Sequence, residues 1–182
     1  MAVRDAFLSP REVRALAGCA RARRGRGEFA EGRIGAGPRI AQRTDVRGDS
    51  ICWLTQPQGA AEARILGRLE ALRQRLNREA FLGLFDLELH YAWYPPGAGY
   101  ARHVDQPLGR AQRRVSLVLY LNEDWSTGDG GALRMHGEQG AQRDIEPLGG
   151  RLVAFLTESR QHEVLPARRA RLSLTGWLRA RE

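Results

Sequence analysis

The hydrophobic periodicity of the chain changes near Gly83, and this change limits the fold more than any other feature of the sequence. Before it, Ile65, Leu69, Leu72 and Leu76 recur at helical spacing. After it, apolar and polar residues alternate with the period of two that a half-buried strand requires. The alternating segments are 86–94, 114–122, 131–136, 151–156, 162–165 and 170–179. Helices followed by many short strands predict an α+β fold, with the helices packed outside a curled sheet.

Two helices are predicted before the strands. Ser9 is a suitable cap, Pro10 suits the first helical position and Glu12 completes a capping box, so a helix is expected over 10–24. Gly25 and Gly27 should end it. The leucine pattern predicts a second helix over 60–78, and a strand is expected over 50–54.

Between the first helix and that strand, residues 25–47 are rich in glycine and arginine. This composition predicts a mobile basic arm; the alternative is a disordered surface loop. The length of 182 residues fits one domain. We expect a single domain over 1–182, with a helical lead-in and its arm over 1–83 and the β core over 84–182.

Composition indicates a reduced, water-soluble protein. Cys19 and Cys52 lack the spacing of a disulfide framework, no apolar run approaches the length needed to cross a bilayer, and the first residues do not resemble a signal peptide. A cytoplasmic location is therefore expected. All 29 basic residues are arginine, which indicates the codon bias of a GC-rich genome, most simply a bacterial one.

The net charge of +8 permits two interpretations. A basic surface can bind nucleic acid, or it can steer an acidic protein partner. The basic residues are scattered through the chain, and only residues 21–26 form a dense run. This distribution favours an acidic protein partner over nucleic acid.

Two of the four histidines belong to a candidate metal site. His103 and Asp105 are two residues apart, so on a strand they would project to the same face. His162 is far enough along the chain to approach from another strand. Two histidines and one carboxylate on one side of an ion leave the opposite positions open, as in non-haem Fe(II) oxygenases. The alternative is an ion pair at a strand end. His90 lacks such partners and is interpreted as structural or surface-exposed.

A second candidate site lies in the last strand. Arg171 alternates with Ser173, Thr175 and Trp177, so these side chains share one face. A guanidinium on an inward face is costly to bury without a partner. The partner is either the carboxylate of a ligand, which arginine binds through two parallel hydrogen bonds, or an internal Asp or Glu.

Six motifs follow one another in order along the chain. They are residues 47–53 (RGDSICW), 94–97 (YPPG), 100–105 (YARHVD), 120–125 (YLNEDW), 130–134 (GGALR) and 162–166 (HEVLP). In order and spacing they resemble the Fe(II)- and 2-oxoglutarate-dependent oxygenases, and within them the prolyl 4-hydroxylases of the hypoxia-sensing type, above all the bacterial members. The resemblance extends from about residue 45 to the C-terminus.

The resemblance implies a double-stranded β-helix (jelly-roll) core with the N-terminal helices outside it. It implies that His103, Asp105 and His162 hold Fe(II). By position, Arg171 and Tyr120 match residues that bind the distal carboxylate of 2-oxoglutarate.

The remaining site residues are expected around these groups. Tyr94 matches a residue lining the same pocket, and Thr175 and Trp177 are expected there because they share the inward face of Arg171. Asp49 and Arg113 match positions near where the protein substrate approaches, so each is a candidate for substrate contact or for an ion pair that fixes a lid.

The implied reaction is hydroxylation of a proline residue in a protein, with dioxygen and 2-oxoglutarate consumed, succinate and carbon dioxide released, and ascorbate as a candidate reductant. Among bacterial relatives the implied substrate is elongation factor Tu. Three alternatives stay open: a hydroxylase of a small molecule or another residue, a nucleic-acid demethylase, and a non-catalytic sensor that binds iron and 2-oxoglutarate. Demethylases of this superfamily carry a second arginine six residues after the anchoring one, where this chain has Trp177.

Overall fold

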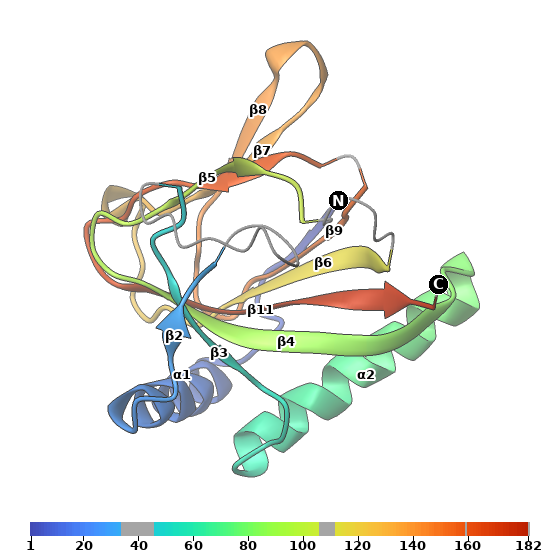
Figure 1. Cartoon of the computed structure of the whole chain (residues 1–182), viewed down its shortest axis with the longest axis horizontal. Helices are drawn as coiled ribbons and strands as arrows, with labels where there is room; N and C mark the ends of the chain where they lie inside the picture. The colour runs from blue at the N-terminus through green and yellow to red at the C-terminus, as the bar shows by residue number, and fades with distance from the viewer. Residues whose placement is uncertain (34–45, 106–111, 159, 182) are drawn as a thin grey trace.

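The computed structural model describes residues 1–33, 46–105, 112–158 and 160–181, which form two antiparallel sheets and two helices (Figure 1). The helices are α1 (Pro10–Gly25) and α2 (Ala60–Ala80). The larger sheet contains, in spatial order, β1 (Ala2–Arg4), β9 (Leu152–Leu156), β6 (Arg113–Tyr120), β11 (Arg171–Ala180), β4 (Leu84–Tyr94), β3 (Ser50–Trp53) and β2 (Ala30–Glu31). The smaller sheet contains β5 (Tyr100–His103), β10 (His162–Val164), β7 (Leu133–His136) and β8 (Gln142–Ile145). Short 3₁₀ turns occupy Thr127–Asp129 and Glu138–Gly140.

Both predicted helices are present, and the local signals explain where they begin and end. The Glu12 side chain accepts from the backbone N–H of Ser9 at 2.8 Å, while the Ser9 hydroxyl accepts from the N–H of Glu12. This is the predicted capping box. The helix α1 ends at Gly25, and Gly27 adopts a φ of +75°, which favours glycine. The helix α2 runs two residues further than predicted and ends where Phe81 turns left-handed.

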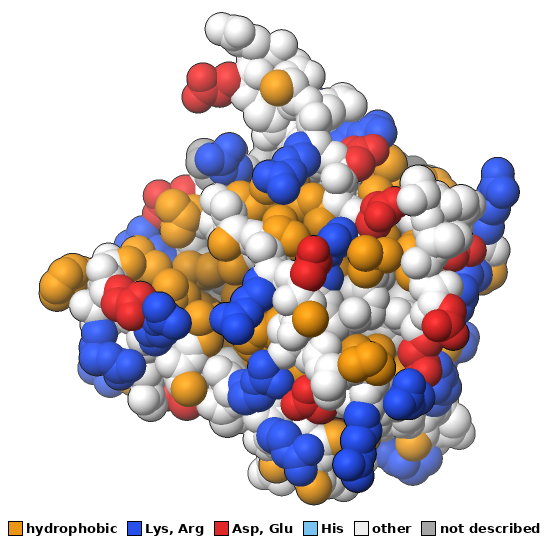
Figure 2. Space-filling view, turned by 180° about the vertical axis from the view of Figure 1, so that it is seen from behind, with side chains coloured by type: hydrophobic (Ala, Val, Ile, Leu, Met, Phe, Trp, Pro, Cys, Tyr) orange, Lys and Arg blue, Asp and Glu red, His pale blue; other side chains and the backbone are white. Residues whose placement is uncertain are grey.

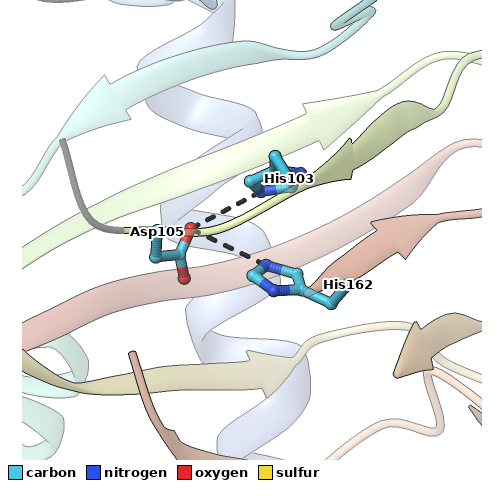
Figure 3. A group of neighbouring side chains, drawn as sticks. All are labelled: His103, Asp105 and His162. Atoms are coloured by element: carbon cyan, nitrogen blue, oxygen red, sulfur yellow. Dashed lines mark ion pairs between the residues drawn. The ribbon is translucent and has the colours of Figure 1, made fainter. Parts of the chain in front are cut away.

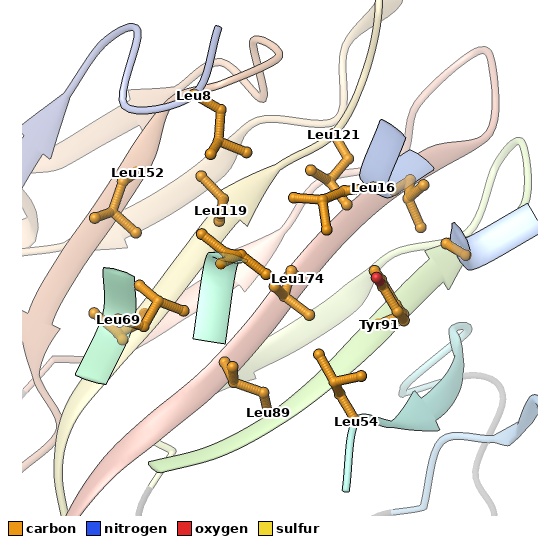
Figure 4. Packing of buried hydrophobic residues seen from close by; sticks show 14 of the residues in the cluster. Leu8, Leu16, Leu54, Leu69, Leu89, Tyr91, Leu119, Leu121, Leu152 and Leu174 are labelled. Carbon is orange, nitrogen blue, oxygen red and sulfur yellow. The ribbon is translucent and has the colours of Figure 1, made fainter. Parts of the chain in front are cut away.

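Two apolar clusters lie on opposite faces of the larger sheet. Leu172, Leu174 and Leu178 face the helices and pack in the cluster drawn in Figure 4, which joins α1 and α2 to the larger sheet. Tyr120 and Val153 belong to the second cluster, which also contains residues of the smaller sheet and therefore lies between the two sheets. The predicted α+β fold, with a jelly-roll core and helices outside it, is confirmed.

A buried ion pair ties the helices to the larger sheet. Arg23 of α1 donates from Nε and Nη2 to the two carboxylate oxygens of Glu62 of α2, both at 2.9 Å. Glu62 has no exposed surface, and the hydroxyl of Tyr91 in β4 donates to it at 3.0 Å. Each oxygen of this buried carboxylate is hydrogen-bonded, as a buried charge requires.

The strands predicted from alternation are all present, whereas β1, β2, β5 and β8 were not predicted. These four strands are two to four residues long, so alternation within them is a weak signal. The equally short strands β7 and β10 were predicted because alternation extends beyond their ends. The expectation that His103 and Asp105 lie on one strand is wrong. The strand β5 ends at His103, and Asp105 lies in a bend beyond it. Of the predicted arm, residues 34–45 lie outside the described part of the chain.

Basic side chains spread over the face shown in Figure 2 and alternate with acidic ones, so no single-sign patch dominates this view. Cys19 and Cys52 are free thiols. Within the described residues, no helix combines the length and apolar character needed to cross a membrane.

Candidate metal centre

His103 and His162 are brought together by strand pairing in the smaller sheet. His103 is the last residue of β5 and His162 the first of β10, and their Cα atoms are direct partners across this antiparallel pair. Their ring centroids are 4.3 Å apart. The prediction that His162 approaches from a second strand is confirmed.

Asp105 completes the group from the bend after β5. Its Oδ1 lies 3.5 Å from Nε2 of His103 and 3.7 Å from Nε2 of His162 (Figure 3). One ligand atom from each of the three residues falls within 4.8 Å of the others. Within the described residues, this is the one such group of histidine, cysteine and carboxylate side chains.

The imidazoles are oriented by the backbone. Nδ1 of His103 lies 2.8 Å from the carbonyl oxygen of Ala101, and Nδ1 of His162 lies 3.0 Å from that of Arg160. A carbonyl can only accept, so each Nδ1 donates to the backbone, which leaves Nε2 as the nitrogen available to a metal ion. Both Nε2 atoms lie on the side of Asp105, as metal ligation requires.

The pKa shifts of His162 and Asp105 favour the binding of a cation. Burial lowers the pKa of His162, which keeps its imidazole neutral at neutral pH. Burial alone would raise the pKa of Asp105, but His103, His162 and a hydrogen bond from Ser116 outweigh it and hold the pKa well below its usual range. Asp105 is therefore an ionised carboxylate beside the two imidazoles.

These residues fit a divalent metal ion. Ligands at right angles and about 2.1 Å from one ion are about 3 Å apart, so the observed separations need only small side-chain movements. Two imidazoles and one carboxylate on one side of the ion are the ligand set of non-haem Fe(II) oxygenases.

Aromatic rings support the two histidines. The ring of Tyr100 stacks on that of His103 at 3.6 Å between centroids and 15° between planes. Phe155 of β9 meets His162 edge-on at 4.9 Å. Such contacts limit the rotation of both imidazoles.

Arg171 of β11 is buried between the two sheets. It is 2% exposed, and its Nε donates to the carbonyl of Gly131 at 3.0 Å. Its guanidinium carbon lies 5.0 Å from the centroid of Tyr120 and 5.2 Å from that of Tyr94. Among the residues that the structure describes, no carboxylate pairs with it, so the internal partner left open by the sequence is absent from this part of the chain.

Two buried polar atoms around Arg171 have no partner within the described structure: Nη2 of Arg171 and the hydroxyl of Tyr120. Burial raises the pKa of Tyr120, so its hydroxyl stays protonated and can donate. A buried charged donor without a partner is costly, which indicates that an acceptor normally binds there. The carboxylate of 2-oxoglutarate has the charge and the two oxygens that these donors require.

Thr175 and Trp177 share the face of Arg171 but lie further along β11. The hydroxyl of Thr175 lies 3.0 Å from that of Ser173. Trp177 contacts Arg113, whose guanidinium carbon is 3.4 Å from its ring centroid, and His90 at 5.4 Å between centroids. Trp177 therefore packs beside Arg113 and His90, and its role toward 2-oxoglutarate stays a prediction.

The two candidate substrate residues are both engaged in ion pairs. Asp49 is buried and accepts from Nε and Nη2 of Arg47 at 2.6 and 3.0 Å. Arg113 pairs with Glu88 at 2.9 Å and donates to the backbone carbonyl of Asp105 at 3.2 Å. Both contacts are compatible with the ion-pair alternative; contact with a substrate stays a prediction.

His90 is 2% exposed and packs against the rings of Trp53 and Trp177, so of its two interpretations the structural one is confirmed and the surface one is wrong. Sequence reasoning missed two features of the site. His136, on β7, contacts Glu163 beside the metal group at 3.0 Å. Ser116 donates to Asp105. The sequence could have indicated this residue, because Ser116 alternates with Val118 and Tyr120 and so lies on the inward face of β6.

Comparison with known proteins agrees with this site. Residues 89–179 match the 2OG-Fe(II) oxygenase superfamily, and the chain belongs to this family. Members of the family use Fe(II), 2-oxoglutarate and dioxygen, so the predicted cofactors are confirmed at the level of the family.

Several similar proteins are prolyl hydroxylases. The chain is similar to a Pseudomonas putida prolyl-4-hydroxylase, with 45% identity and a TM-score of 0.88 over 100% of this chain and 92% of that one. It is also similar to a Trichoplax adhaerens prolyl hydroxylase solved with a hypoxia inducible factor peptide, with 28% identity and a TM-score of 0.85 over 97% and 81% of the two chains. Egl nine homolog 1 of Homo sapiens is 33% identical over 95% of this chain. The chain spans 42% of that human protein.

Proposed function

We propose that this protein hydroxylates a proline residue in a protein substrate and depends on Fe(II) and 2-oxoglutarate. The observation that carries the proposal is the combination of two separate sites between the same sheets. One holds three metal ligands, and the other holds a buried guanidinium whose Nη2 has no partner within the described structure, beside a tyrosine hydroxyl. The similarity to prolyl hydroxylases supports proline as the target.

Each group has a proposed role. Fe(II) would be held by Nε2 of His103, Nε2 of His162 and Oδ1 of Asp105. With dioxygen and 2-oxoglutarate, the bound iron would oxidise a C–H bond to C–OH, and succinate and carbon dioxide would be released. Arg171 and Tyr120 bind the distal carboxylate and set the orientation of 2-oxoglutarate. Tyr94 borders the proposed 2-oxoglutarate site beside Arg171, and the apolar residues between the sheets exclude water.

The substrate is proposed to be an acidic protein, with elongation factor Tu as the specific candidate. The net charge of +8 supports an acidic partner, because opposite charges raise the rate of encounter. The similarity to a Pseudomonas enzyme and the arginine-only basic composition support a bacterial source. The two free thiols suit a reducing cytoplasm. Ascorbate as reductant stays a prediction.

The test uses an Asp105→Ala variant to trap partners from a bacterial lysate. The trapped proteins are then treated with active enzyme and 2-oxoglutarate, and mass spectrometry measures a gain of one oxygen on a proline. Free proline, single-stranded methylated nucleic acid and a proline-containing loop peptide of elongation factor Tu are compared as substrates. If the small molecule or the nucleic acid is oxidised efficiently and no protein or peptide is, the proposed function is wrong.

A further inference from the structure

A buried serine lies directly behind the metal-binding carboxylate. Ser116 has no exposed surface, and its hydroxyl donates to Oδ2 of Asp105 at 2.6 Å. The two oxygens of Asp105 therefore have different surroundings. Oδ1 faces the nitrogens of His103 and His162, as the dashed lines in Figure 3 show, whereas Oδ2 is occupied by the serine.

The two residues differ in how firmly the backbone holds them. Asp105 lies in a bend beyond the end of β5, outside any strand ladder. Ser116 lies in the middle of β6, which is paired with β9 on one side and β11 on the other. The strand β6 also holds the backbone of Asp105, because Arg113 donates to its carbonyl. A loop-borne ligand is thus fixed by a strand in the interior of the sheet.

The hydrogen bond has the character of a strong one. A hydroxyl donating to an ionised carboxylate gives a short, charge-assisted bond, and 2.6 Å lies in that range. A free carboxylate can bind a metal ion through one oxygen or through both. The hydrogen bond to Oδ2 disfavours the second mode, and the ion then keeps the coordination positions that a co-substrate needs.

We propose that Ser116 is a positioning residue for the metal centre: it restricts Asp105 to ligation through Oδ1. This inference rests on the proposed metal site. It does not depend on which substrate is hydroxylated, because its test measures metal binding by the protein itself.

The experiment compares Ser116→Ala and Ser116→Thr with the wild-type protein. Hydrogen-bond partners of metal ligands typically contribute 10- to 100-fold to metal affinity, so Ser116→Ala should bind Mn²⁺ at least about tenfold more weakly, measured by calorimetry. The absorption spectrum of bound Co²⁺, which reports coordination number, should change. Ser116→Thr keeps a hydroxyl and should restore both properties. Circular dichroism and thermal unfolding establish that each variant is folded.

Tyr91→Phe is the matched control, because Tyr91 is also a buried hydroxyl that donates to a carboxylate, that of Glu62 on the helix side of the larger sheet. It should be destabilised while its Mn²⁺ affinity and Co²⁺ spectrum stay those of the wild type. Wild-type affinity and spectrum in Ser116→Ala would overturn the inference, as would an equal loss in Tyr91→Phe. If Ser116→Ala does not fold, Ser116→Cys serves in its place, since it keeps the volume and weakens the donor. Normal metal binding without any hydroxylated protein would contradict the proposed function alone.

Discussion

His103 and His162 are cross-strand partners, the last residue of β5 opposite the first residue of β10. Successive side chains of a strand point to opposite faces, so a shift of one residue in this pairing would turn one imidazole away from the other. The metal group thus depends on the register of two strands that are four and three residues long. The backbone carbonyls of Ala101 and Arg160 then set which nitrogen of each ring faces the ion.

Removing one imidazole should abolish metal-dependent activity without unfolding the protein. We expect His162→Ala to lose succinate formation and high-affinity Mn²⁺ binding, because two ligands do not hold the ion in place. His136→Ala is the control: this histidine lies on the neighbouring strand β7 and pairs with Glu163 outside the metal group. Full turnover in His162→Ala would show that the metal site is elsewhere.

Arg171 should set the affinity for 2-oxoglutarate and leave metal affinity unchanged. Arg171→Ala removes a hydrogen bond to a charged group, about 1.5–3 kcal/mol, so the KM for 2-oxoglutarate should rise about 10- to 100-fold. Arg171→Lys keeps the charge but loses the planar fork, and KM should still rise. Arg169→Lys is the control, since Arg169 is exposed, donates to the backbone carbonyls of Glu123 and Asp124, and pairs with Asp129. An unchanged KM in both Arg171 variants would place the anchor elsewhere.

His90 should make the protein less stable in mild acid. Burial, aided by the charge of Arg47, lowers the pKa of His90 to about 4, against about 6.5 in the unfolded chain. Between these two pH values the unfolded state binds more protons, so stability is lost as the pH falls from about 6.5 to about 4. The loss due to His90 is about 3 kcal/mol at most.

The measurement is the free energy of unfolding of the metal-free protein at several pH values, for the wild type and for His90→Gln. The variant cannot titrate at this position, so its stability should fall less steeply. His162, whose pKa burial also lowers, is present in both proteins and contributes equally. Parallel curves for the two proteins would show that His90 is accessible to protons in the folded state.

The buried Arg23–Glu62 pair should be worth far more than an exposed pair. Glu62→Ala leaves the guanidinium of Arg23 buried without its main partner and should cost about 3–5 kcal/mol in the free energy of unfolding. Glu79→Ala removes an exposed i,i+4 partner of Arg75 and should change the free energy of unfolding by about 0.5 kcal/mol or less. Denaturant unfolding measures both. Equal effects would mean that the helices are held to the sheet by apolar packing alone.

Local patterns in the sequence predicted most of the elements correctly. The capping box at Ser9 and Glu12 and the leucine spacing of α2 predicted both helices, because each signal acts within a few residues. Alternation predicted β4, β6, β7, β9, β10 and β11 and placed Arg171 on the inward face. It gave no signal for β5, which ends at His103, so His103 and Asp105 do not share a strand.

The sequence by itself determined which residues are available for chemistry: two histidines and an aspartate for a metal, and an arginine on an inward strand face. Only the tertiary structure decided how they meet. Oδ2 of Asp105 accepts a hydrogen bond from Ser116, eleven residues further along the chain on β6. Whether His90 is buried depends on Trp53 and Trp177 from two other strands. These relationships arise from strand register and packing between segments distant in the chain, and periodicity within one segment carries no information about them.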